Sequence, residues 1–204
     1  MPNIFRWPAE RPLPEDFLAD LKKAHDGVFV YPTNTLYGLG ACIRSPKAIR
    51  LVFEIKARPK DFPLPVMANF GQIRDICEVT DISLPFLKHS DTRVTAVLPS
   101  GKSAPKEIVH RGTVAVRLPC SKLTESLVGS VGPITSTSAN VHGQPTPAEI
   151  GPLVSEFGER ISAYIDSGRL EGLPTTIIDF TGDRPKIIRE GALSRDEMER
   201  TYER

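Results

Sequence analysis

The stretch YPTNTLYGLGA, residues 31–41, sets the interpretation of the whole chain. It carries two hydroxyl residues, Thr33 and Thr35, between aromatic side chains, and Gly-Leu-Gly follows. It lacks the Gly-Lys-Ser/Thr ending of a P-loop and the G-x-G-x-x-G fingerprint of dinucleotide-binding folds. Apolar runs predict a buried strand over residues 27–32 and a second strand over residues 36–43. A hydroxyl-bearing turn therefore joins the two predicted strands.

The composition indicates a globular protein without a bulk electrostatic field. Hydrophobic residues make up 40% of the 204 residues, and 26 basic residues face 25 acidic ones. Any anion site must therefore be a local cluster. Three widely spaced cysteines, Cys42, Cys77 and Cys120, fit a reduced protein with neither a disulfide framework nor metal spacing. No signal peptide or membrane span is evident, so a cytoplasmic location is expected.

The predicted elements mix strands and helices without strict alternation. This pattern predicts an α/β (α+β) fold, with one twisted mixed parallel and antiparallel sheet flanked by helices. We expect a single domain over residues 1–204, with its core at about residues 13–192. Helices are predicted at residues 13–25, 45–57, 121–128 and 147–157, after residue 69 and from residue 194. Further strands are predicted at residues 64–68, 93–98, 113–118, 133–137, 162–165, 176–180 and 186–189.

Two stretches contain cations in places that need a partner. In KARPKDFPL (residues 56–64), Lys56, Arg58 and Lys60 lie where a predicted helix ends. They either complement the helix dipole or clamp a phosphate or carboxylate. In TVAVRLP (residues 113–119), Arg117 lies on an otherwise apolar strand, where a buried salt bridge or a bound carboxylate would satisfy it.

Two further stretches are rich in hydroxyl groups. PITSTSANVHGQPTP (residues 133–147) carries hydroxyls at the end of a predicted strand, where α/β sheets often bind ligands, although turn chemistry also favours them. PTTIID (residues 174–179) opens another strand with two hydroxyls, and Arg189 closes the last one. No Gly-x-Ser-x-Gly elbow, catalytic triad or metal-ligand cluster is present. This inventory fits a site that binds and positions anions while ATP supplies the activation.

These stretches, in this order, resemble the YrdC-like family of threonylcarbamoyl-AMP synthases. Any one motif is weak, but six in sequence order are specific, and they span residues 24–192. The resemblance implies a YrdC-like fold and a short, single-domain member. The matching segments are Pro32–Gly40, Lys56–Leu64, Val116–Pro119, Ser138–Pro145, Thr175–Asp179 and Arg189–Gly191.

The resemblance implies a reaction and its participants. L-threonine, bicarbonate and ATP would become threonylcarbamoyl-AMP and pyrophosphate, with Mg²⁺ on the phosphates. Downstream transferase proteins would then modify an adenosine in tRNA.

The resemblance also implies roles for particular residues, and it implies no metal ligands among the side chains. Lys56 and Arg58 would be catalytic, and Tyr37 would shape the pocket. The residues expected to bind threonine are Thr35, Met67, Arg117 and Thr175. The residues expected around ATP are Lys56, Arg58, Thr113, Ser136, Ser138, Asn140, Thr146 and Arg189.

Three departures from the family pattern keep other functions open. Many members have His at the position of Met67, Pro-Gly-Pro-x-Thr in place of residues 90–95, and a small polar residue at Phe62. The PTTIID and Arg-Glu-Gly segments resemble the YciO-type branch, whereas the Ser-Ala-Asn turn resembles the synthase branch. A nucleotide-binding paralogue without synthase activity is one alternative. A double-stranded RNA-binding module is another, although the near-zero net charge argues against it. Its basic residues would be Lys56, Arg58, Lys60, Arg111, Arg117 and Arg189.

Overall fold

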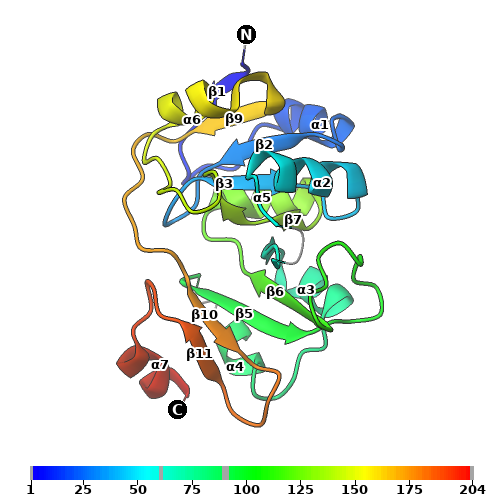
Figure 1. Cartoon of the computed structure of the whole chain (residues 1–204), viewed down its shortest axis with the longest axis vertical. Helices are drawn as coiled ribbons and strands as arrows, with labels where there is room; N and C mark the ends of the chain where they lie inside the picture. Colours follow the sequence, from blue (N-terminus) through cyan, green and yellow to red (C-terminus); the bar gives the residue numbers. More distant parts are fainter. Residues whose placement is uncertain (1, 60–61, 89–91, 203–204) are drawn as a thin grey trace.

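The computed structural model describes residues 2–59, 62–88 and 92–202, and within them the strands form two mixed sheets. Lys60, Ser90 and Asp91, which enter the predictions above, lie outside the described residues. Figure 1 shows the first sheet with α1 (Glu15–Lys23), α2 (Pro46–Ile55), α5 (Lys122–Val131) and α6 (Ile150–Phe157) in one half of the molecule. Most of the second sheet lies in the other half with α3 (Phe70–Ile76), α4 (Leu84–Lys88) and α7 (Arg195–Tyr202). The fold class is therefore confirmed, with two sheets in place of the expected one.

The helices agree closely with the predicted spans, except for the short helix over residues 84–88, which was not predicted. Ser45 caps α2, its side chain accepting from the Ala48 backbone N–H, and Pro46 takes the first helical position. Asn69 and Gln72 form a capping box at the start of α3. The bounds are α1 (Glu15–Lys23), α2 (Pro46–Ile55), α3 (Phe70–Ile76), α4 (Leu84–Lys88), α5 (Lys122–Val131), α6 (Ile150–Phe157), the 3-10 turn η1 (Gly158–Arg160) and α7 (Arg195–Tyr202).

The first sheet has the order β1-β9-β2-β3-β8. Its strands are β1 (Ile4–Arg6), β9 (Ala163–Asp166), β2 (Val28–Tyr31), β3 (Gly38–Ala41) and β8 (Thr137–Ser138). The central pair β2 and β3 is antiparallel and fully buried. Gly40 is required there because a Cβ would overlap the Phe29 ring. Strand β1 was not predicted, since its three residues are too few for a periodicity signal.

The second sheet has the order β11-β10-β5-β6-β4-β7. Its strands are β11 (Lys186–Arg189), β10 (Thr176–Asp179), β5 (Val94–Pro99), β6 (Thr113–Arg117), β4 (Val66–Met67) and β7 (Ile134–Thr135). The β5–β6 and β10–β11 pairs are antiparallel, and β10 lies parallel to β5.

One predicted strand, residues 133–137, explains why there are two sheets in the described part of the chain. Its first half, β7, pairs with β4 of the second sheet, and β8, immediately after it, pairs with β3 of the first sheet. Ser136 lies between them, and its N–H donates to the Pro65 carbonyl. Local periodicity predicts a strand but not its partners, so this division was invisible in the sequence.

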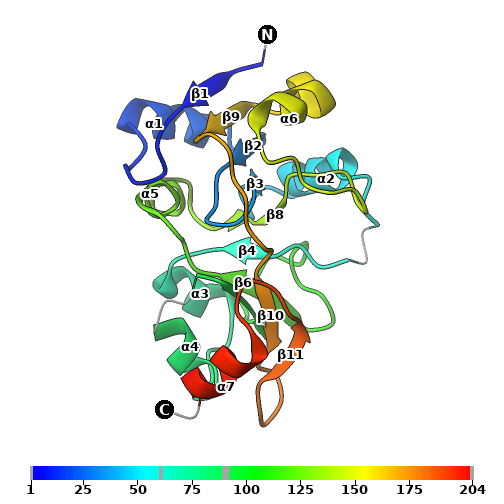
Figure 2. The same cartoon turned by 90° about the vertical axis from the view of Figure 1, so that its left-hand side faces the viewer.

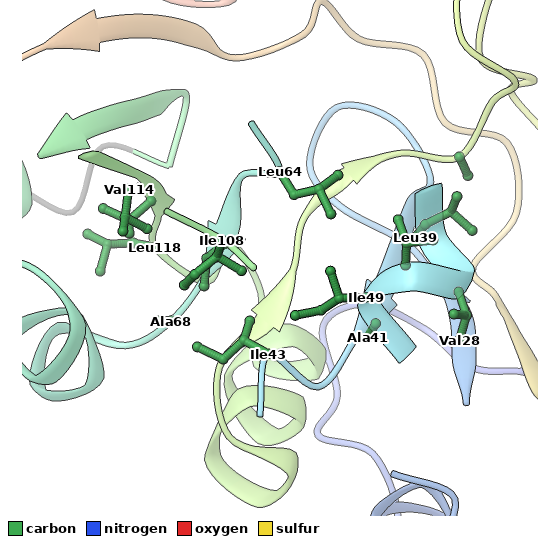
Figure 3. Close-up of a cluster of buried hydrophobic side chains, with 14 of the residues drawn as sticks. Val28, Leu39, Ala41, Ile43, Ile49, Leu64, Ala68, Ile108, Val114 and Leu118 are labelled. Atoms are coloured by element: carbon green, nitrogen blue, oxygen red, sulfur yellow. The ribbon is translucent and has the colours of Figure 1, made fainter. Parts of the chain in front are cut away.

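Buried side chains from both sheets pack into one hydrophobic cluster. Figure 3 shows Val28, Leu39 and Ile49 on one side of this cluster and Val114 and Leu118 on the other. The segment between β9 and β10 crosses from one half to the other in both views (Figures 1 and 2). Among the described residues, no helix has the length and apolar character needed to cross a bilayer.

Candidate active site

The turn between β2 and β3 presents a hydroxyl acceptor. Thr33 Oγ1 donates to the Leu36 carbonyl at 2.7 Å and accepts from the Thr35 and Leu36 N–H groups. The two Thr hydroxyls lie 3.0 Å apart. Either hydroxyl of the pair could be the donor in this contact. Both side chains are buried.

A cavity of about 480 Å³ opens next to this turn. Its walls come from both sheets and from the loops around residues 63–65, 140–146 and 174–175. The structure thereby collects most of the predicted site residues in one place. They are Thr35, Arg58, Arg117, Ser136, Ser138, Asn140, Thr146, Thr175 and Arg189, and Tyr37 lines the same cavity.

Arg117 is buried in the cavity wall, with 6% of its surface exposed. Its Nη2 donates to Asn34 Oδ1 at 2.9 Å and to the Thr92 carbonyl at 3.2 Å. Its Nε has no partner among the described residues. The described residues also place no carboxylate within ion-pair distance of it, so of the two partners considered for Arg117, a bound anion fits the geometry.

Two further guanidinium groups line the cavity and rest on neutral oxygens. Arg58 donates to the Pro63 carbonyl at 3.0 Å, and its buried Nε has no partner in the described part of the chain. Arg189 donates to the Thr175 carbonyl at 2.8 Å. Burial lowers the pKa of both arginines from their usual range. Because their buried charge is not neutralised by these contacts, an anion entering the cavity would be stabilised.

Lys56 lies behind the cavity wall rather than in it. Its side chain is 1% exposed, and Nζ donates to the Ser138 carbonyl, the Asn140 carbonyl and Asn140 Oδ1. The three acceptors match the three donors of a protonated ammonium. Burial, together with the charge of Arg58, lowers the pKa of Lys56 to about 7. In this conformation Lys56 holds the Ser-Ala-Asn turn, and a direct phosphate contact would require it to leave these oxygens.

A strained residue separates Lys56 from Arg58. Ala57 has a φ of +46°, in the left-handed region that favours glycine. Its N–H donates to the Glu54 carbonyl, and the Arg58 N–H donates to the Phe53 carbonyl. This turn ends α2, and it leaves Lys56 bonded to the Ser-Ala-Asn turn and Arg58 in the cavity lining.

Besides Lys56, two predicted site residues do not line the cavity. Met67 is fully buried and packs in a second hydrophobic cluster with residues such as Phe29 and Leu127. Thr113 shares the cavity face of β6 with Arg117, but it lies four residues away, about 13 Å along a strand. Its hydroxyl donates to the His110 carbonyl instead. The contacts of Met67 with threonine and of Thr113 with ATP therefore stay predictions.

Thr95 is a lining residue that sequence reasoning missed. It is 2% exposed, and its hydroxyl lies 2.7 Å from that of Thr175. A polar residue on the apolar strand β5 is the same signal that singled out Arg117.

Phe62, one of the three departures from the family pattern, does not line the cavity. It is 43% exposed, and its ring centre lies 5.4 Å from the Arg58 guanidinium carbon.

Comparisons with known proteins identify the family. Residues 23–191 match the Sua5/YciO/YrdC family model, described as telomere recombination. The chain therefore belongs to this family, and the resemblance found in the sequence is confirmed.

Curated relatives include synthases and a YciO protein. The chain is 34% identical over 176 residues to the threonylcarbamoyl-AMP synthase of Pyrococcus abyssi, covering 83% of this chain and 52% of the relative. It is 31% identical over 184 residues to the Bacillus subtilis synthase, covering 84% and 52%. The chain thus spans about half the length of these relatives. The uncharacterized protein YciO of Escherichia coli is 27% identical over 171 residues, covering 81% and 83%.

Solved structures show the same two branches. P. abyssi Sua5 complexed with L-threonine superposes with a TM-score of 0.88 at 29% identity, covering 98% of this chain and 60% of that one. E. coli YciO superposes with a TM-score of 0.84 at 25% identity, covering 94% and 96%.

Proposed function

We propose that this protein is an L-threonylcarbamoyladenylate synthase, which makes threonylcarbamoyl-AMP and pyrophosphate from L-threonine, bicarbonate and ATP. The observation that carries the proposal is the cavity itself. Among the described residues it is lined by Arg58, Arg117 and Arg189 together with many hydroxyl groups, and by no carboxylate. Such a lining favours ligands that are anionic at several points, as a nucleotide triphosphate and an amino acid together are.

The amino-acid end of the cavity is formed by Arg117 and three threonines. Arg117 Nε, the buried donor with no partner in the described residues, would bind the threonine carboxylate. The Thr35 hydroxyl, which lines the cavity, would hydrogen-bond to the substrate. The paired hydroxyls of Thr95 and Thr175 would line the side-chain pocket. These contacts hold the amine for attack on bicarbonate, which forms the carbamate and releases water.

The nucleotide end lies toward the Ser-Ala-Asn turn. Arg58 and Arg189 would neutralise charge as a carbamate oxygen attacks the α-phosphorus and pyrophosphate leaves. Ser136 and Thr146 would donate to phosphate or ribose oxygens. Ser138, whose hydroxyl donates to Asn140 Oδ1, would accept from a ribose hydroxyl. Lys56 would act through the turn that it holds.

Mg²⁺ fits this site only as part of the substrate. The residues lining the cavity include no Asp or Glu, and the described residues contain no cluster of three metal-binding side chains. Magnesium would therefore arrive on the ATP phosphates, where it would supply further neutralisation of charge.

The decisive experiment measures pyrophosphate release by the purified protein with ATP, Mg²⁺ and bicarbonate, with and without L-threonine. The product is identified by mass spectrometry. Arg117→Gln removes the guanidinium in the cavity, and Arg50→Gln removes an exposed guanidinium on α2 as a matched control. Threonine-dependent release that is lost only in Arg117→Gln supports the proposal. Absence of threonine-dependent release from the wild type contradicts it.

The likeness to YciO over nearly the whole of both structures favours a second candidate. In that case the protein binds a nucleotide in the same cavity but does not transfer its adenylyl group to a threonine carbamate. Calorimetry would then show ATP binding that L-threonine does not strengthen. A double-stranded RNA-binding role predicts instead an affinity for RNA that falls steeply between two salt concentrations.

If the product is threonylcarbamoyl-AMP, its mixed anhydride must be consumed by a transferase that acts on tRNA. The partners of this protein would then include such downstream tRNA-modifying transferases.

A further inference from the structure

Asn34 is the residue between the two threonines of the β2–β3 turn, and it does not line the main cavity. It lines a second hollow of about 470 Å³ together with Cys120 and Ser121, whereas Thr33 and Thr35 line both hollows. Asn34 nevertheless contacts one residue that lines the main cavity.

That residue is Arg117. Asn34 Oδ1 accepts from Arg117 Nη2 at 2.9 Å, which is shorter than the 3.2 Å bond from the same nitrogen to the Thr92 carbonyl. In the described part of the chain, these are the two acceptors found for the Arg117 side chain. A guanidinium without a carboxylate partner depends on such neutral acceptors for its orientation.

Asn34 is itself held from two directions. Its Nδ2 donates to Thr92 Oγ1 at 3.0 Å, and its backbone N–H donates to Cys120 Sγ at 3.3 Å. These contacts join the β2–β3 turn of the first sheet to the start of β5 and to the end of β6 in the second. These contacts fix the amide between Thr92 and Arg117. The fixed amide in turn restricts the orientation of the Arg117 guanidinium.

We propose that Asn34 is a positioning residue that orients Arg117 so that Nε points at the carboxylate of the bound amino acid. The identity of that ligand rests on the proposed function, whereas the orientation of Arg117 does not. Loss of the Asn34 acceptor leaves Nη2 with the longer Thr92 bond and allows the buried guanidinium to turn. The nucleotide, which binds at the other end of the cavity, should be little affected.

The test compares Asn34→Ala, Asn34→Asp and, as a control, Asn3→Ala at an exposed asparagine near the N-terminus. We expect Asn34→Ala to raise KM for L-threonine about tenfold, the size of one lost charge-assisted hydrogen bond, while KM for ATP changes less than about twofold. Asn34→Asp keeps an oxygen acceptor but adds a negative charge beside Arg117, so it should hold the guanidinium in place while weakening its attraction for a carboxylate. A uniform effect of Asn34→Ala on both substrates, or no effect, would overturn the proposal.

A ligand-free measurement separates this inference from the proposed function. With ¹⁵N-labelled arginine, the guanidinium signals of Arg117 are assigned by their loss in Arg117→Lys. Restricted rotation in the wild type and Asn34→Asp, with free rotation in Asn34→Ala, supports the positioning role even if no pyrophosphate is released. The same rotation in all three proteins overturns it.

Discussion

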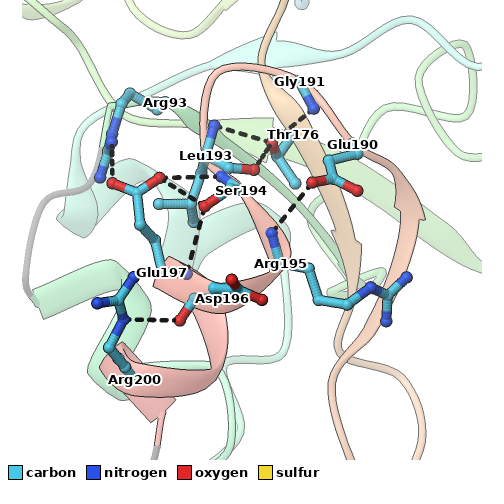
Figure 4. Close-up of polar contacts among 10 residues, drawn as sticks. All are labelled: Arg93, Thr176, Glu190, Gly191, Leu193, Ser194, Arg195, Asp196, Glu197 and Arg200. Carbon is cyan, nitrogen blue, oxygen red and sulfur yellow. Dashed lines mark hydrogen bonds and ion pairs between the residues drawn. The ribbon is translucent and has the colours of Figure 1, made fainter.

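The cavity wall and the C-terminal clip contain similar polar groups, but they use them differently. We define the clip as Thr176, Gly191, Leu193, Ser194 and Glu197 with Arg93 (Figure 4). Thr176 Oγ1 donates to the Leu193 carbonyl and accepts from the Gly191 and Leu193 N–H groups. Glu197 accepts from Ser194 and pairs with Arg93 at 3.0 Å.

The cavity wall leaves some of its polar groups without a hydrogen-bond partner in the described part of the chain. Among the described residues, the buried side-chain nitrogens and oxygens without a partner are Arg58 Nε and Arg117 Nε. Both belong to residues that line the cavity. A hydrogen-bond network in which every buried group has a partner stabilises the fold. A network with unpaired buried donors costs stability, and a ligand that accepts from those donors would explain why they are there. Substitutions in the two regions should therefore affect different properties.

The largest effect is expected at Arg117. Arg117→Gln should lower kcat/KM for L-threonine by about 100-fold or more, since a charged hydrogen bond to the substrate is lost. Its free energy of unfolding in urea should stay the same or rise, because the substitution removes an uncompensated buried charge. If Arg117→Gln instead lowered the free energy of unfolding markedly and left kcat/KM unchanged, Arg117 would stabilise the fold rather than bind a ligand.

Thr176→Val should produce the opposite pattern. The substitution leaves a buried N–H group, a part-buried N–H group and a buried carbonyl without their hydroxyl partner, which should lower the free energy of unfolding by about 2–4 kcal/mol. Thr181→Val, at an exposed hydroxyl bonded to Asp179, is the matched control and should change it by less than about 0.5 kcal/mol. Urea denaturation measures both, and equal losses would show that the clip is not a stabilising network.

Ala57→Gly sharpens the comparison at the edge of the cavity. Because Ala57 has a φ of +46° and an exposed side chain, glycine should relieve strain and raise the free energy of unfolding by about 0.5–1 kcal/mol. Ala24→Gly is the control. Ala24 ends α1 at a φ of −84°, which suits alanine, so glycine there should lower the free energy of unfolding. Thermal unfolding distinguishes the two, and destabilisation by both would contradict the strain at Ala57.

The smallest effect is expected from titrating the clip. Hydrogen bonds from the Ser194 backbone and side chain, and then from Arg93, lower the pKa of Glu197 to about 2. A lowered pKa means that its stabilisation is present above the unfolded pKa, about 4.5, and is lost as the pH falls toward 2. Glu197→Gln should therefore reduce stability at pH 6 more than at pH 3. Equal reductions at the two pH values would exclude this pH-dependent contribution.

Much of the fold follows from local signals. Ser45–Pro46 and Asn69 begin helices as predicted, and the apolar runs at β2, β5 and β6 are strands. Strand β1 and helix α4 were not predicted, because each is only three to five residues long and has little periodicity of its own. The residues of the candidate site were predicted largely from six motifs in sequence order. A motif names residue types but does not place them in space, so the arrangement of the cavity could not be predicted.

By itself, the sequence determined the order of most elements, the helix caps and the family, because these depend on neighbouring residues and on motif order. The tertiary structure alone decided three other features: the split of residues 134–138 between two sheets, the burial of Lys56 against the Ser-Ala-Asn turn, and the exclusion of Met67 and Thr113 from the cavity. Each depends on pairing between segments distant in sequence. Such pairing is set by burial and by long-range hydrogen bonding, which local periodicity does not encode.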